Sequence, residues 1–463
     1  MDDLERSLHR AADLIAGYRR DAAATRVGAA AGREDVAAAL DAHLPDGPTP
    51  LTLVIDELMA GATPGLVCTP GPRYFGFVVG GSLDAALIAD LLTSGWDQNA
   101  FNAALAPAAL AFEDLAGAWL KDLLGLPASA SVGFVTGAGA ANTVGLAAGR
   151  SHVLAARGWD VGHDGLLGAP RVRVMAGAER HATIDRALRL LGLGDGSIEP
   201  VPALANGEMD ARALTAMLAA SPGVPTIVCA QAGNVNTGAC DDLRAIGTAT
   251  RAHGAWLHVD GAFGLWAAAC PRTAHLVEGV ELADSWGCDG HKWLNVPYDS
   301  GYAFCAYPEV HAESMAYTAA YLSGQVAGRA FGGGDFTIES SRRARGFATW
   351  AALRALGRSG ISDLVDRCCR MAQRFAEQLE AVDGCEVAND VVLNQVLVRV
   401  GDEALTDSVE RRVQEEGTCW LGATTWRGER LLRISVSNWS TGEADVDAGV
   451  EAIRAAREAV VAV

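Results

Sequence analysis

Short apolar runs alternate with longer amphipathic stretches along residues 83–310. The short runs predict strands, and apolar residues spaced three or four positions apart predict helices. The predicted strands are 131–136, 171–175, 226–230 and 255–260. The predicted helices are one that follows the loop 137–139 and runs to about 156, then 181–191 and 241–253. This alternation indicates a mostly parallel sheet with helices on both faces. Because ligands of such sheets bind beyond the carboxyl ends of the strands, we expect the functional side chains there.

The remainder of the chain has a different pattern. Residues 1–60 carry apolar residues at helical spacing, and a break rich in proline and glycine follows at 64–72. From residue 346 a long helix is predicted to residue 379, then strands near 396–400 and 431–436, then a last helix from Glu443. We therefore predict three domains: an N-terminal helical arm over residues 1–82, a large α/β domain over 83–345 and a smaller α+β domain over 346–463.

Residues 312–345 interrupt the alternating pattern. They contain five glycines, namely Gly324, Gly328, Gly332, Gly333 and Gly334. A long glycine-rich segment inside an enzyme-sized domain is typical of an active-site flap. A plain surface connection is the alternative.

Charge and composition narrow the function classes. The net charge is -19, which argues against nucleic acid and anionic membranes as partners because both require clustered Lys and Arg. We see no uninterrupted apolar run of about 18 residues and no signal-peptide core behind the acidic N-terminus. The ten cysteines are scattered without Cys-x-x-Cys spacing, which indicates buried free thiols in a reducing compartment. We therefore expect a cytoplasmic protein.

The lysine in Asp289-Gly290-His291-Lys292-Trp293 is the first candidate for chemistry. Its aromatic neighbours argue against a plain solvated charge. A neutral lysine amine, which partial burial favours, can attack an aldehyde. His-Lys dipeptides are common, however, so Lys292 gains weight only from other residues.

Asp260 ends the predicted strand 255–260, so its carboxylate is expected in the ligand crevice. A turn residue or a helix N-cap is the alternative. In pyridoxal-phosphate sites an acidic residue pairs with the protonated pyridine nitrogen and keeps the ring able to accept electrons. The small residues Gly261 and Ala262 would let a flat ring lie close.

Two further segments follow strand ends. The loop Gly137-Ala138-Gly139 lies between a strand and a helix, where backbone N–H groups suit a phosphate, although a tight turn is the alternative. It lacks the Lys-Ser/Thr of a nucleotide P-loop, which disfavours ATP. His181 opens a helix, as an ordinary helix residue or as an imidazole stacked on a cofactor ring.

These elements occur in the order phosphate-type loop, histidine, strand-end aspartate and lysine, with the lysine 32 residues beyond the aspartate. In this combination the chain resembles the group II pyridoxal-phosphate decarboxylases, which include aromatic-amino-acid, histidine and glutamate decarboxylases. The resemblance covers about residues 65–455 and is strongest in 258–264 and 284–295. It implies an α/β protein of the type I (aspartate-aminotransferase-like) fold, with a mostly parallel central sheet, a smaller C-terminal α+β domain, and a homodimer with shared active sites.

The resemblance also implies a role for each matching residue. Lys292 forms the internal aldimine with pyridoxal 5'-phosphate, and His181 stacks on the ring and helps to place the substrate carboxylate. The residues implied in cofactor binding are Ala138, Gly139, His181, Asn234, Asp260, Ala262, Asp289, His291 and Lys292. Those implied in substrate binding are Phe77, in the aromatic segment Tyr74-Phe75-Gly76-Phe77, together with Asn99 and Phe101, an aromatic that reaches across the dimer interface.

Three positions depart from the family pattern. Asn234 stands where the family often has Thr or Ser, and Asp289 stands where Asn or Thr is usual. A carboxylate near a phosphate is unusual, so Asp289 either faces away or binds a Lys or Arg. Gln98-Asn99 replaces apolar residues and implies a more polar pocket.

The fourth departure lies in the predicted flap. Family decarboxylases carry a mobile-loop tyrosine that protonates the α-carbon after carbon dioxide leaves. An ungapped match places Gly333 there, with Phe336 nearby, and the loop tyrosines are Tyr317 and Tyr321. Either one of these swings in, or the partner subunit supplies the acid, or this step differs. In some family members phenylalanine in place of tyrosine diverts the reaction to oxygen and gives an aldehyde.

The leading hypothesis is α-decarboxylation of an L-amino acid to its amine and carbon dioxide. The alternatives are oxidative deamination to an aldehyde, an aminotransferase that uses Arg433 for the substrate carboxylate, and a non-enzymatic pyridoxal-phosphate-binding regulator. The substrate is left open, because Phe77, Trp96 and Phe101 favour an aromatic or branched side chain whereas Gln98 and Asn99 favour a polar one.

Overall fold

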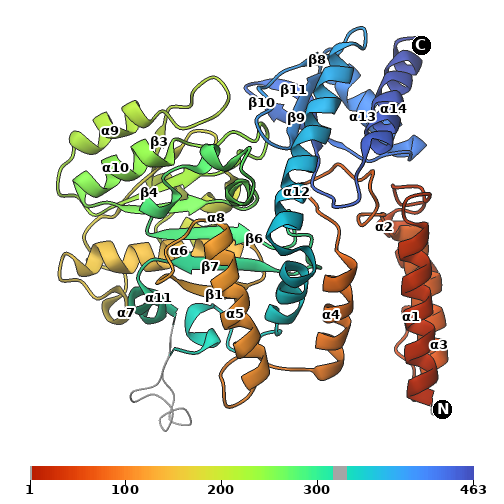
Figure 1. The fold of residues 1–463 in the computed structure, drawn as a ribbon, viewed down its shortest axis with the longest axis horizontal. Coiled ribbons are helices and arrows are strands. Elements are labelled where there is room, and N and C mark those ends of the chain that lie inside the picture. The colour runs from red at the N-terminus through yellow and green to blue at the C-terminus, as the bar shows by residue number, and fades with distance from the viewer. Residues whose placement is uncertain (1–2, 316–330, 463) are drawn as a thin grey trace. The chain divides into compact units, whose positions relative to one another are not determined.

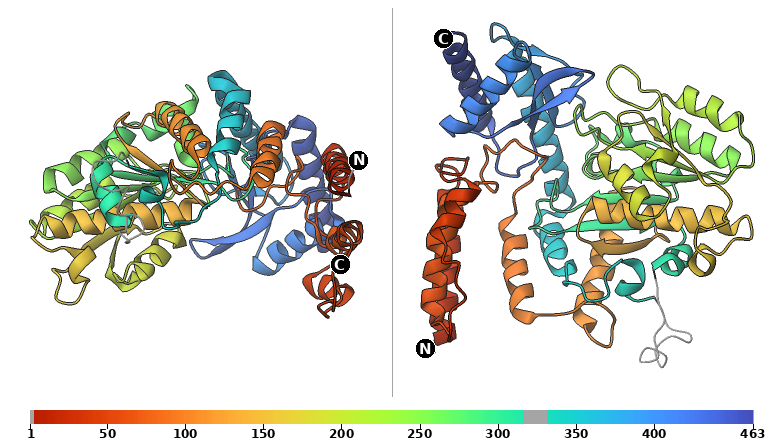
Figure 2. Two further views of the ribbon diagram at one scale, coloured as in Figure 1. Left: turned by 90° about the horizontal axis from the view of Figure 1, so that it is seen from below. Right: turned by 180° about the vertical axis from the view of Figure 1, so that it is seen from behind.

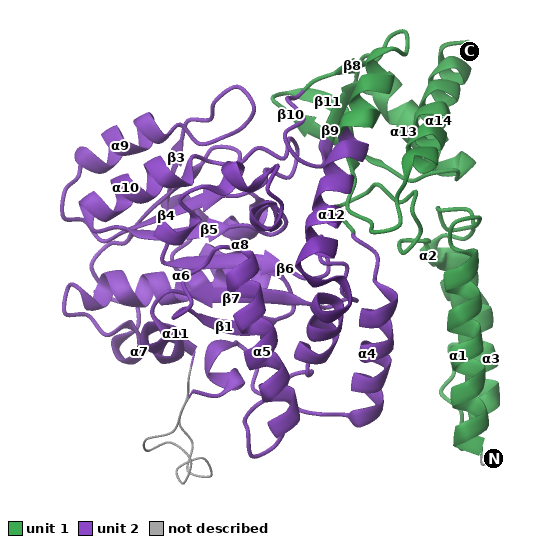
Figure 3. Cartoon of the chain, viewed as in Figure 1, with its two compact units in different colours: residues 1–79, 373–388, 396–463 green, residues 80–372, 389–395 purple. Residues whose placement is uncertain are grey.

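The computed structural model describes residues 3–315 and 331–462. Its helices and strands follow one another as Figure 1 shows. Two compact units result, one of residues 80–372 and 389–395, the other of residues 1–79, 373–388 and 396–463 (Figure 3).

The larger unit contains a seven-stranded sheet in the order β1-β7-β6-β5-β4-β2-β3. The strands are β1 (Ser131–Val135), β2 (Arg173–Gly177), β3 (Ile198–Val201), β4 (Thr226–Gln231), β5 (Trp256–Asp260), β6 (Ser285–Asp289) and β7 (Gly301–Cys305). Strands β3, β2, β4, β5 and β6 pair in parallel, and β7 pairs antiparallel with both β6 and β1. The prediction of a mostly parallel sheet is therefore confirmed.

Helices accompany this sheet in the larger unit, and most of them alternate with its strands along the chain. They are α4 (Asp84–Trp96), α5 (Pro107–Leu123), α6 (Ala138–Ala155), α7 (Val161–Asp164), α8 (Ala182–Leu190), α9 (Ala211–Ala219), α10 (Leu243–His253) and α11 (Pro308–Met315). Helix α6 packs along β5, β6 and β7 and against α8. Leu146, Val174, Ile184, Ile227 and Trp256 lie in the apolar core that these elements enclose.

The smaller unit combines N-terminal helices with the C-terminal part of the chain. It contains α1 (Asp3–Asp21), α2 (Arg33–Ala39), α3 (Leu51–Ala62), α13 (Glu403–Glu416), α14 (Glu443–Val461) and the strands β8 (Glu386–Val387), β10 (Gly422–Trp426) and β11 (Glu429–Ser435). Its sheet has the order β10-β11-β9-β8, in which β9 (Gln395–Arg399) pairs antiparallel with β8. Helices α1 and α3 lie side by side (Figure 2).

The long helix α12 (Gly346–Glu380) spans the boundary between the two units, which divide the chain at residue 372. Within it, Gly357 has non-helical dihedral angles (φ 61°, ψ -179°) and kinks the helix. In the part of the chain that the structure describes, no helix is both long enough and apolar enough to cross a membrane.

Candidate active site

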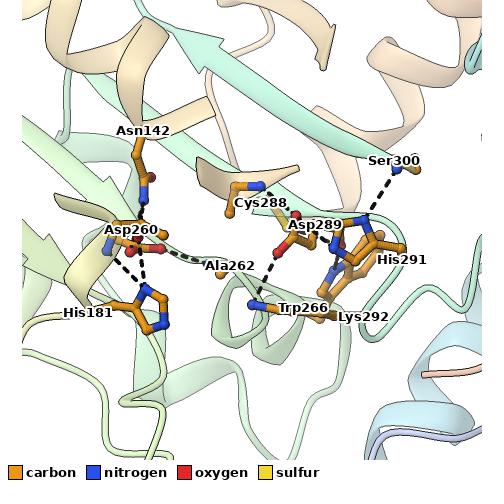
Figure 4. A network of polar contacts seen from close by, with 12 residues as sticks. Asn142, His181, Asp260, Ala262, Trp266, Cys288, Asp289, His291, Lys292 and Ser300 are labelled. Carbon is orange, nitrogen blue, oxygen red and sulfur yellow. Dashed lines mark hydrogen bonds and ion pairs between the residues drawn. The ribbon is translucent and has the colours of Figure 1, made fainter. Parts of the chain in front are cut away.

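The carboxyl ends of β1, β2, β4, β5 and β6 lie at one edge of the large sheet. These strands all run in one direction, because β1 and β6 are both antiparallel to β7. The predicted residues follow those ends: Ala138 after β1, His181 after β2, Asn234 after β4, Asp260 at the end of β5 and Lys292 after β6. Segments far apart in the chain are thus brought together, as Figure 4 shows for most of them.

Asp260 is buried, with 5% of its surface exposed. Its Oδ2 accepts a hydrogen bond from Asn142 Nδ2 at 3.0 Å, and its Oδ1 accepts one from the Ala262 N–H at 3.2 Å. Two donors on one buried carboxylate stabilise its negative charge. Asp260 is therefore suited to pair with a protonated ring nitrogen.

His181 is the N-cap of α8. Its Nδ1 accepts a hydrogen bond from the Thr183 N–H at 3.2 Å and lies 2.9 Å from Thr183 Oγ1. Because Nδ1 is the acceptor, a neutral imidazole carries its hydrogen on Nε2. The two interpretations of His181 are therefore compatible, since the capping bond also fixes the ring.

The chain has only two lysines, Lys121 and Lys292. Lys121 Nζ donates to the carbonyls of Ala128 and Ala130, at 2.8 and 2.7 Å, and so ties the end of α5 to the following loop. Lys292 Nζ instead lies among the strand ends, 3.1 Å from Asp289 Oδ2 (Figure 4). Lys292 is consequently the lysine that the fold offers to an aldehyde.

The Asp289 side chain is 3% exposed and faces inward. Besides its ion pair with Lys292, it accepts the Ala138 N–H at 2.5 Å and lies 3.4 Å from His291 Nε2. Of the two alternatives for this unusual carboxylate, the structure therefore selects binding to a lysine. Burial lowers the pKa of His291, whose Nδ1 accepts the Ser300 N–H at 3.2 Å.

The loop before α6 fits an anionic group. Gly137 is the N-cap of this 18-residue helix and supplies no side-chain cap, so the first-turn N–H groups depend on other acceptors. Asp289 accepts the first of them, from Ala138, whereas Gly139 is exposed. Backbone N–H groups and the helix dipole suit a phosphate here. With the acid, imidazole and amine described above, the site fits pyridoxal phosphate.

Asn234 is fully buried, and its amide holds a turn together. Its Oδ1 accepts the N–H groups of Asn236 and Thr237, and its Nδ2 donates to the Glu179 carbonyl. These bonds give Asn234 a structural role in the loop after β4. Its contact with the cofactor stays a prediction.

The three predicted substrate residues lie on two different segments. Asn99 Oδ1 accepts the Arg342 N–H at 3.1 Å, and the Phe101 carbonyl accepts the Gly334 N–H at 3.0 Å. Both residues therefore contact the C-terminal part of the predicted flap, residues 331–345. In the smaller unit, Phe77 is 64% exposed and its ring lies 5.3 Å from that of Trp420. Substrate binding by these residues stays a prediction.

The flap is described in part. Residues Tyr317 and Tyr321 lie outside the described residues. A Cβ atom at Gly333 would lie 1.8 Å from Arg342 Nη2, so a side chain at the position matched to the family tyrosine would have to displace the Arg342 guanidinium. Phe336 packs against the ring of His311, 4.8 Å between centroids.

Asn142 and Thr183 were not predicted as site residues, although they join Asp260 to His181. Asn142 lies one turn into α6, and its Nδ2 is 3.0 Å from Asp260 and 3.3 Å from Thr183 Oγ1. A polar residue one helical turn after the phosphate-type loop was the available signal, because positions four apart share a helix face.

The model of the family described as "Pyridoxal-dependent decarboxylase conserved domain" matches residues 34–400. The chain belongs to this family. It is 29% identical to tryptophan decarboxylase 1 of Oryza sativa subsp. japonica over 98% of this chain and 93% of the relative. It is 28% identical to 4-hydroxyphenylacetaldehyde synthase of Rhodiola rosea, over 86% and 83% of the two chains.

Solved structures agree with this assignment. The crystal structure of Oryza sativa TDC with PLP and tryptamine has a TM-score of 0.91 and 25% identity, and the match covers 99% of this chain and 98% of that one. Mouse CSAD shares the fold at a TM-score of 0.89, over 98% of both chains and with 21% identity. The predicted fold, cofactor and enzyme class are confirmed: the chain is a pyridoxal-phosphate-dependent amino acid decarboxylase.

Proposed function

We propose that this decarboxylase converts an aromatic L-amino acid to its amine and carbon dioxide. The observation that carries the proposal is the position of Lys292, one of two lysines, among strand ends that also hold Asp260 and His181. The aromatic preference is supported by the similarity to tryptophan decarboxylase 1 over nearly the whole chain.

Phe77 is held in place by its neighbours. Its backbone is left-handed (φ 51°), and Trp420, against which its ring lies, stacks on Tyr74 with 5.0 Å between ring centroids. A bulky residue with positive φ is strained, which is typical of positions fixed for function. An exposed, rigid aromatic ring suits an aromatic substrate side chain.

Each residue of the site would have its own role toward the cofactor or the substrate. Lys292 would hold the cofactor covalently, Asp260 would pair with its ring nitrogen, and His181 and Ala262 would contact the ring. The bound cofactor supplies the electron sink for the electrons that remain when the substrate carboxylate leaves. His181 would direct its Nε2–H toward the substrate, where it can orient the carboxylate.

The phosphate would be held by backbone rather than by cationic side chains. Gly139 is an exposed residue in the first turn of α6, and His291 lies beside Asp289 at the same loop. Asp289 would orient Lys292 through their 3.1 Å ion pair. We therefore assign Gly139 and His291 to the phosphate and Asp289 to the lysine, whereas the N–H of Ala138, also predicted for the phosphate, donates to Asp289.

A substrate panel tests the proposal. The purified enzyme, loaded with pyridoxal phosphate, is incubated with L-tryptophan, L-tyrosine, L-phenylalanine and L-glutamate, and carbon dioxide and amine are measured. We expect the highest kcat/KM with an aromatic substrate and none with Lys292→Ala, which should also lack the visible absorbance of the bound cofactor. Preference for L-glutamate would refute the aromatic assignment, and a surviving absorbance band in the variant would refute the role of Lys292.

Oxidative deamination to an aldehyde is the second candidate. It is favoured by Gly333, which stands at the position matched to the family tyrosine and where a side chain would displace Arg342, and by the similarity to 4-hydroxyphenylacetaldehyde synthase. An oxygen electrode in the same assay distinguishes the two reactions. Oxygen uptake and peroxide in step with carbon dioxide would establish the aldehyde product, and their absence rejects it.

The enzyme would act as a homodimer. Helices α1 and α3 each bury a single residue and expose Leu4, Leu8, Leu53, Val54 and Leu58. A helix pair this poorly buried gains little stability from its own contacts, so a second copy is expected to cover it. Sedimentation should give twice 48.0 kDa, and the double variant Leu8→Glu/Leu58→Glu should shift the mass toward the monomer. A monomeric wild type would refute this state.

We place the enzyme in the cytoplasm. The ten cysteines are free thiols, and eight of them are buried. Free thiols in this number suit a reducing compartment. Fractionation of the source cells, with antibody detection, would test the placement, and recovery in an oxidising compartment would refute it.

A further inference from the structure

Five side chains form a continuous line of hydrogen bonds that ends at Asp260. Trp256 Nε1 lies 3.0 Å from Ser285 Oγ, which lies 2.9 Å from His258 Nδ1. His258 Nε2 lies 3.0 Å from Asn142 Oδ1, and Asn142 Nδ2 lies 3.0 Å from Asp260 Oδ2. None of the five is more than 5% exposed. The line crosses β5, β6 and α6 and is closed to solvent.

The two ends of this line fix its direction. An indole N–H can only donate, so the hydrogen of Trp256 points to Ser285. An ionised carboxylate can only accept, so Asn142 must turn its NH₂ group toward Asp260 and its carbonyl toward His258. His258 then has to carry its hydrogen on Nε2. Its Nδ1 accepts the hydroxyl hydrogen of Ser285, whose other acceptor, the Gly145 carbonyl, is more distant at 3.4 Å.

His258 takes part in this line as a neutral ring. Burial lowers its pKa to about 3. A neutral imidazole has one donor and one acceptor, which the line uses completely. Every bond therefore runs from Trp256 toward Asp260, and each donor adds to the stabilisation of the carboxylate charge.

Asn142 also connects this line to His181. The second hydrogen of its NH₂ group points to Thr183 Oγ1 at 3.3 Å. Thr183 Oγ1 then has its own hydrogen free to donate to His181 Nδ1, 2.9 Å away. With the Thr183 N–H on the same atom, His181 Nδ1 is held as an acceptor. One amide group thus contacts Asp260 directly and is linked to His181 through Thr183.

The surrounding backbone leaves room for these side chains only because it is glycine at two points. A Cβ atom at Gly145 would lie 2.7 Å from the His258 ring, and one at Gly287 would lie 2.4 Å from Asn142 Oδ1. Any larger residue would displace the imidazole or the amide. The orientation of both groups is therefore imposed by packing as well as by hydrogen bonds.

We propose that Asn142 is a positioning residue that orients two groups at once: the carboxylate of Asp260, directly, and the imidazole of His181, through Thr183 Oγ1. Trp256, Ser285 and His258 are the donors that orient its amide. This inference rests on the proposed roles of Asp260 and His181 toward the cofactor. It adds a connection through the protein between Asp260, which is proposed to pair with the ring nitrogen, and His181, which is proposed to stack on the ring.

The variants Asn142→Leu and Trp256→Phe test this proposal in the holoenzyme. We expect Asn142→Leu to lower the affinity for pyridoxal phosphate about 10- to 100-fold, because one hydrogen bond to a charged group is lost. It should also shift the absorption spectrum of the bound cofactor and its pH titration. Trp256→Phe should shift the spectrum in the same direction by a smaller amount.

Trp286→Phe is the matched control. Trp286 is a fully buried tryptophan on the neighbouring strand, and its Nε1 donates to the Val280 carbonyl, outside the line. It should lower the melting temperature as Trp256→Phe does, with a wild-type spectrum and cofactor affinity. If both variants change the spectrum equally, the effect is one of packing and the proposal is wrong.

Histidine ring ¹⁵N spectra of the holoenzyme provide a direct readout. His258 and His181 should both be in the Nε2–H form. In Asn142→Leu the Thr183 N–H still holds His181 in this form, but the His181 ring resonances should shift because Thr183 Oγ1 has lost its donor. An Nδ1–H form of His258, or unchanged affinity, spectrum and ring resonances in Asn142→Leu, overturns the proposal.

Asp260→Asn distinguishes failure of the proposed function from failure of this inference. If Asp260→Asn leaves the spectrum unchanged, the proposed role of Asp260 is wrong. If Asp260→Asn changes the spectrum and Asn142→Leu does not, only the role of Asn142 is refuted.

Discussion

Replacing His258 by glutamine should reduce the loss of folding stability that this protein undergoes at acidic pH. His258 is fully buried, and burial lowers its pKa to about 3 from an ordinary value of 6.5. Between these two pH values the unfolded chain binds a proton at this ring and the folded chain does not. Stability therefore falls as the pH drops below 6.5 and continues to fall until about pH 3.

The size of the effect follows from the two pKa values. Each decade of pH between them removes about 1.4 kcal/mol. The ring should then reduce the free energy of unfolding by about 2 kcal/mol at pH 5 and by roughly 5 kcal/mol at pH 3, relative to pH 8. Glutamine places its amide near the position of Nε2, so it keeps the donor to Asn142 but cannot take up a proton.

Urea unfolding followed by tryptophan fluorescence at pH 8 and pH 5 measures the difference. His258→Gln should lose about 2 kcal/mol less than the wild type over this interval. His152→Gln, which removes an exposed histidine from α6, is the control and should behave as the wild type. If His258→Gln and the wild type show the same loss, a proton reaches the buried ring without unfolding and the reasoning is refuted.

Further predictions concern residues 331–345, the C-terminal part of the predicted flap. Glu113→Gln leaves the Arg342 guanidinium, bound at 2.6 and 2.7 Å and fully buried, without its carboxylate. We expect urea unfolding to show a loss of about 3–5 kcal/mol, against 1 kcal/mol or less for Asp122→Asn in an exposed pair; equal losses would contradict this. Gly333→Ala should lower the melting temperature, because its Cβ would strike Arg342, whereas Gly95→Ala in α4 has open space and should not. A wild-type melting temperature for Gly333→Ala would contradict the close contact.

Much of the large domain could be predicted from its sequence because its strands are short apolar runs between helices. Strand β6 was missed as a strand because Ser285-Trp286-Gly287-Cys288-Asp289 contains small and polar residues. These residues are nonetheless fully buried, since Ser285 and Gly287 make room for His258 and Asn142. A tertiary requirement thus overrode the local pattern.

The helix predicted from Asp241 shows the limit of local rules. The helix begins at Leu243, and Asp242 is its N-cap. Asp241 instead accepts the N–H groups of Met209 and Gln231, and burial raises its pKa to about 7. Two adjacent aspartates satisfy the same capping rule in sequence, and only the long-range contacts of one of them distinguish the two.

In the candidate site, too, some residues could be found from the sequence and others could not. Lys292, Asp260 and His181 could be found because strand ends and residue order identify them. His258 lies two residues before Asp260, on the same face of the strand, so strand periodicity could also have indicated it. Asn234 was predicted from its position after β4, where it departs from the family's Thr or Ser; its amide holds a turn, which the sequence did not indicate, and its contact with the cofactor stays a prediction.

Reductive trapping tests the central claim most directly, because the chain offers only two lysines. The holoenzyme is reduced with borohydride, which makes the bond between cofactor and lysine permanent, and its peptides are analysed by mass spectrometry. We predict that the pyridoxyl mass is found on Lys292 and that Lys121 is unmodified. Labelling of Lys121, or of neither lysine in an enzyme that still releases carbon dioxide, would contradict the account.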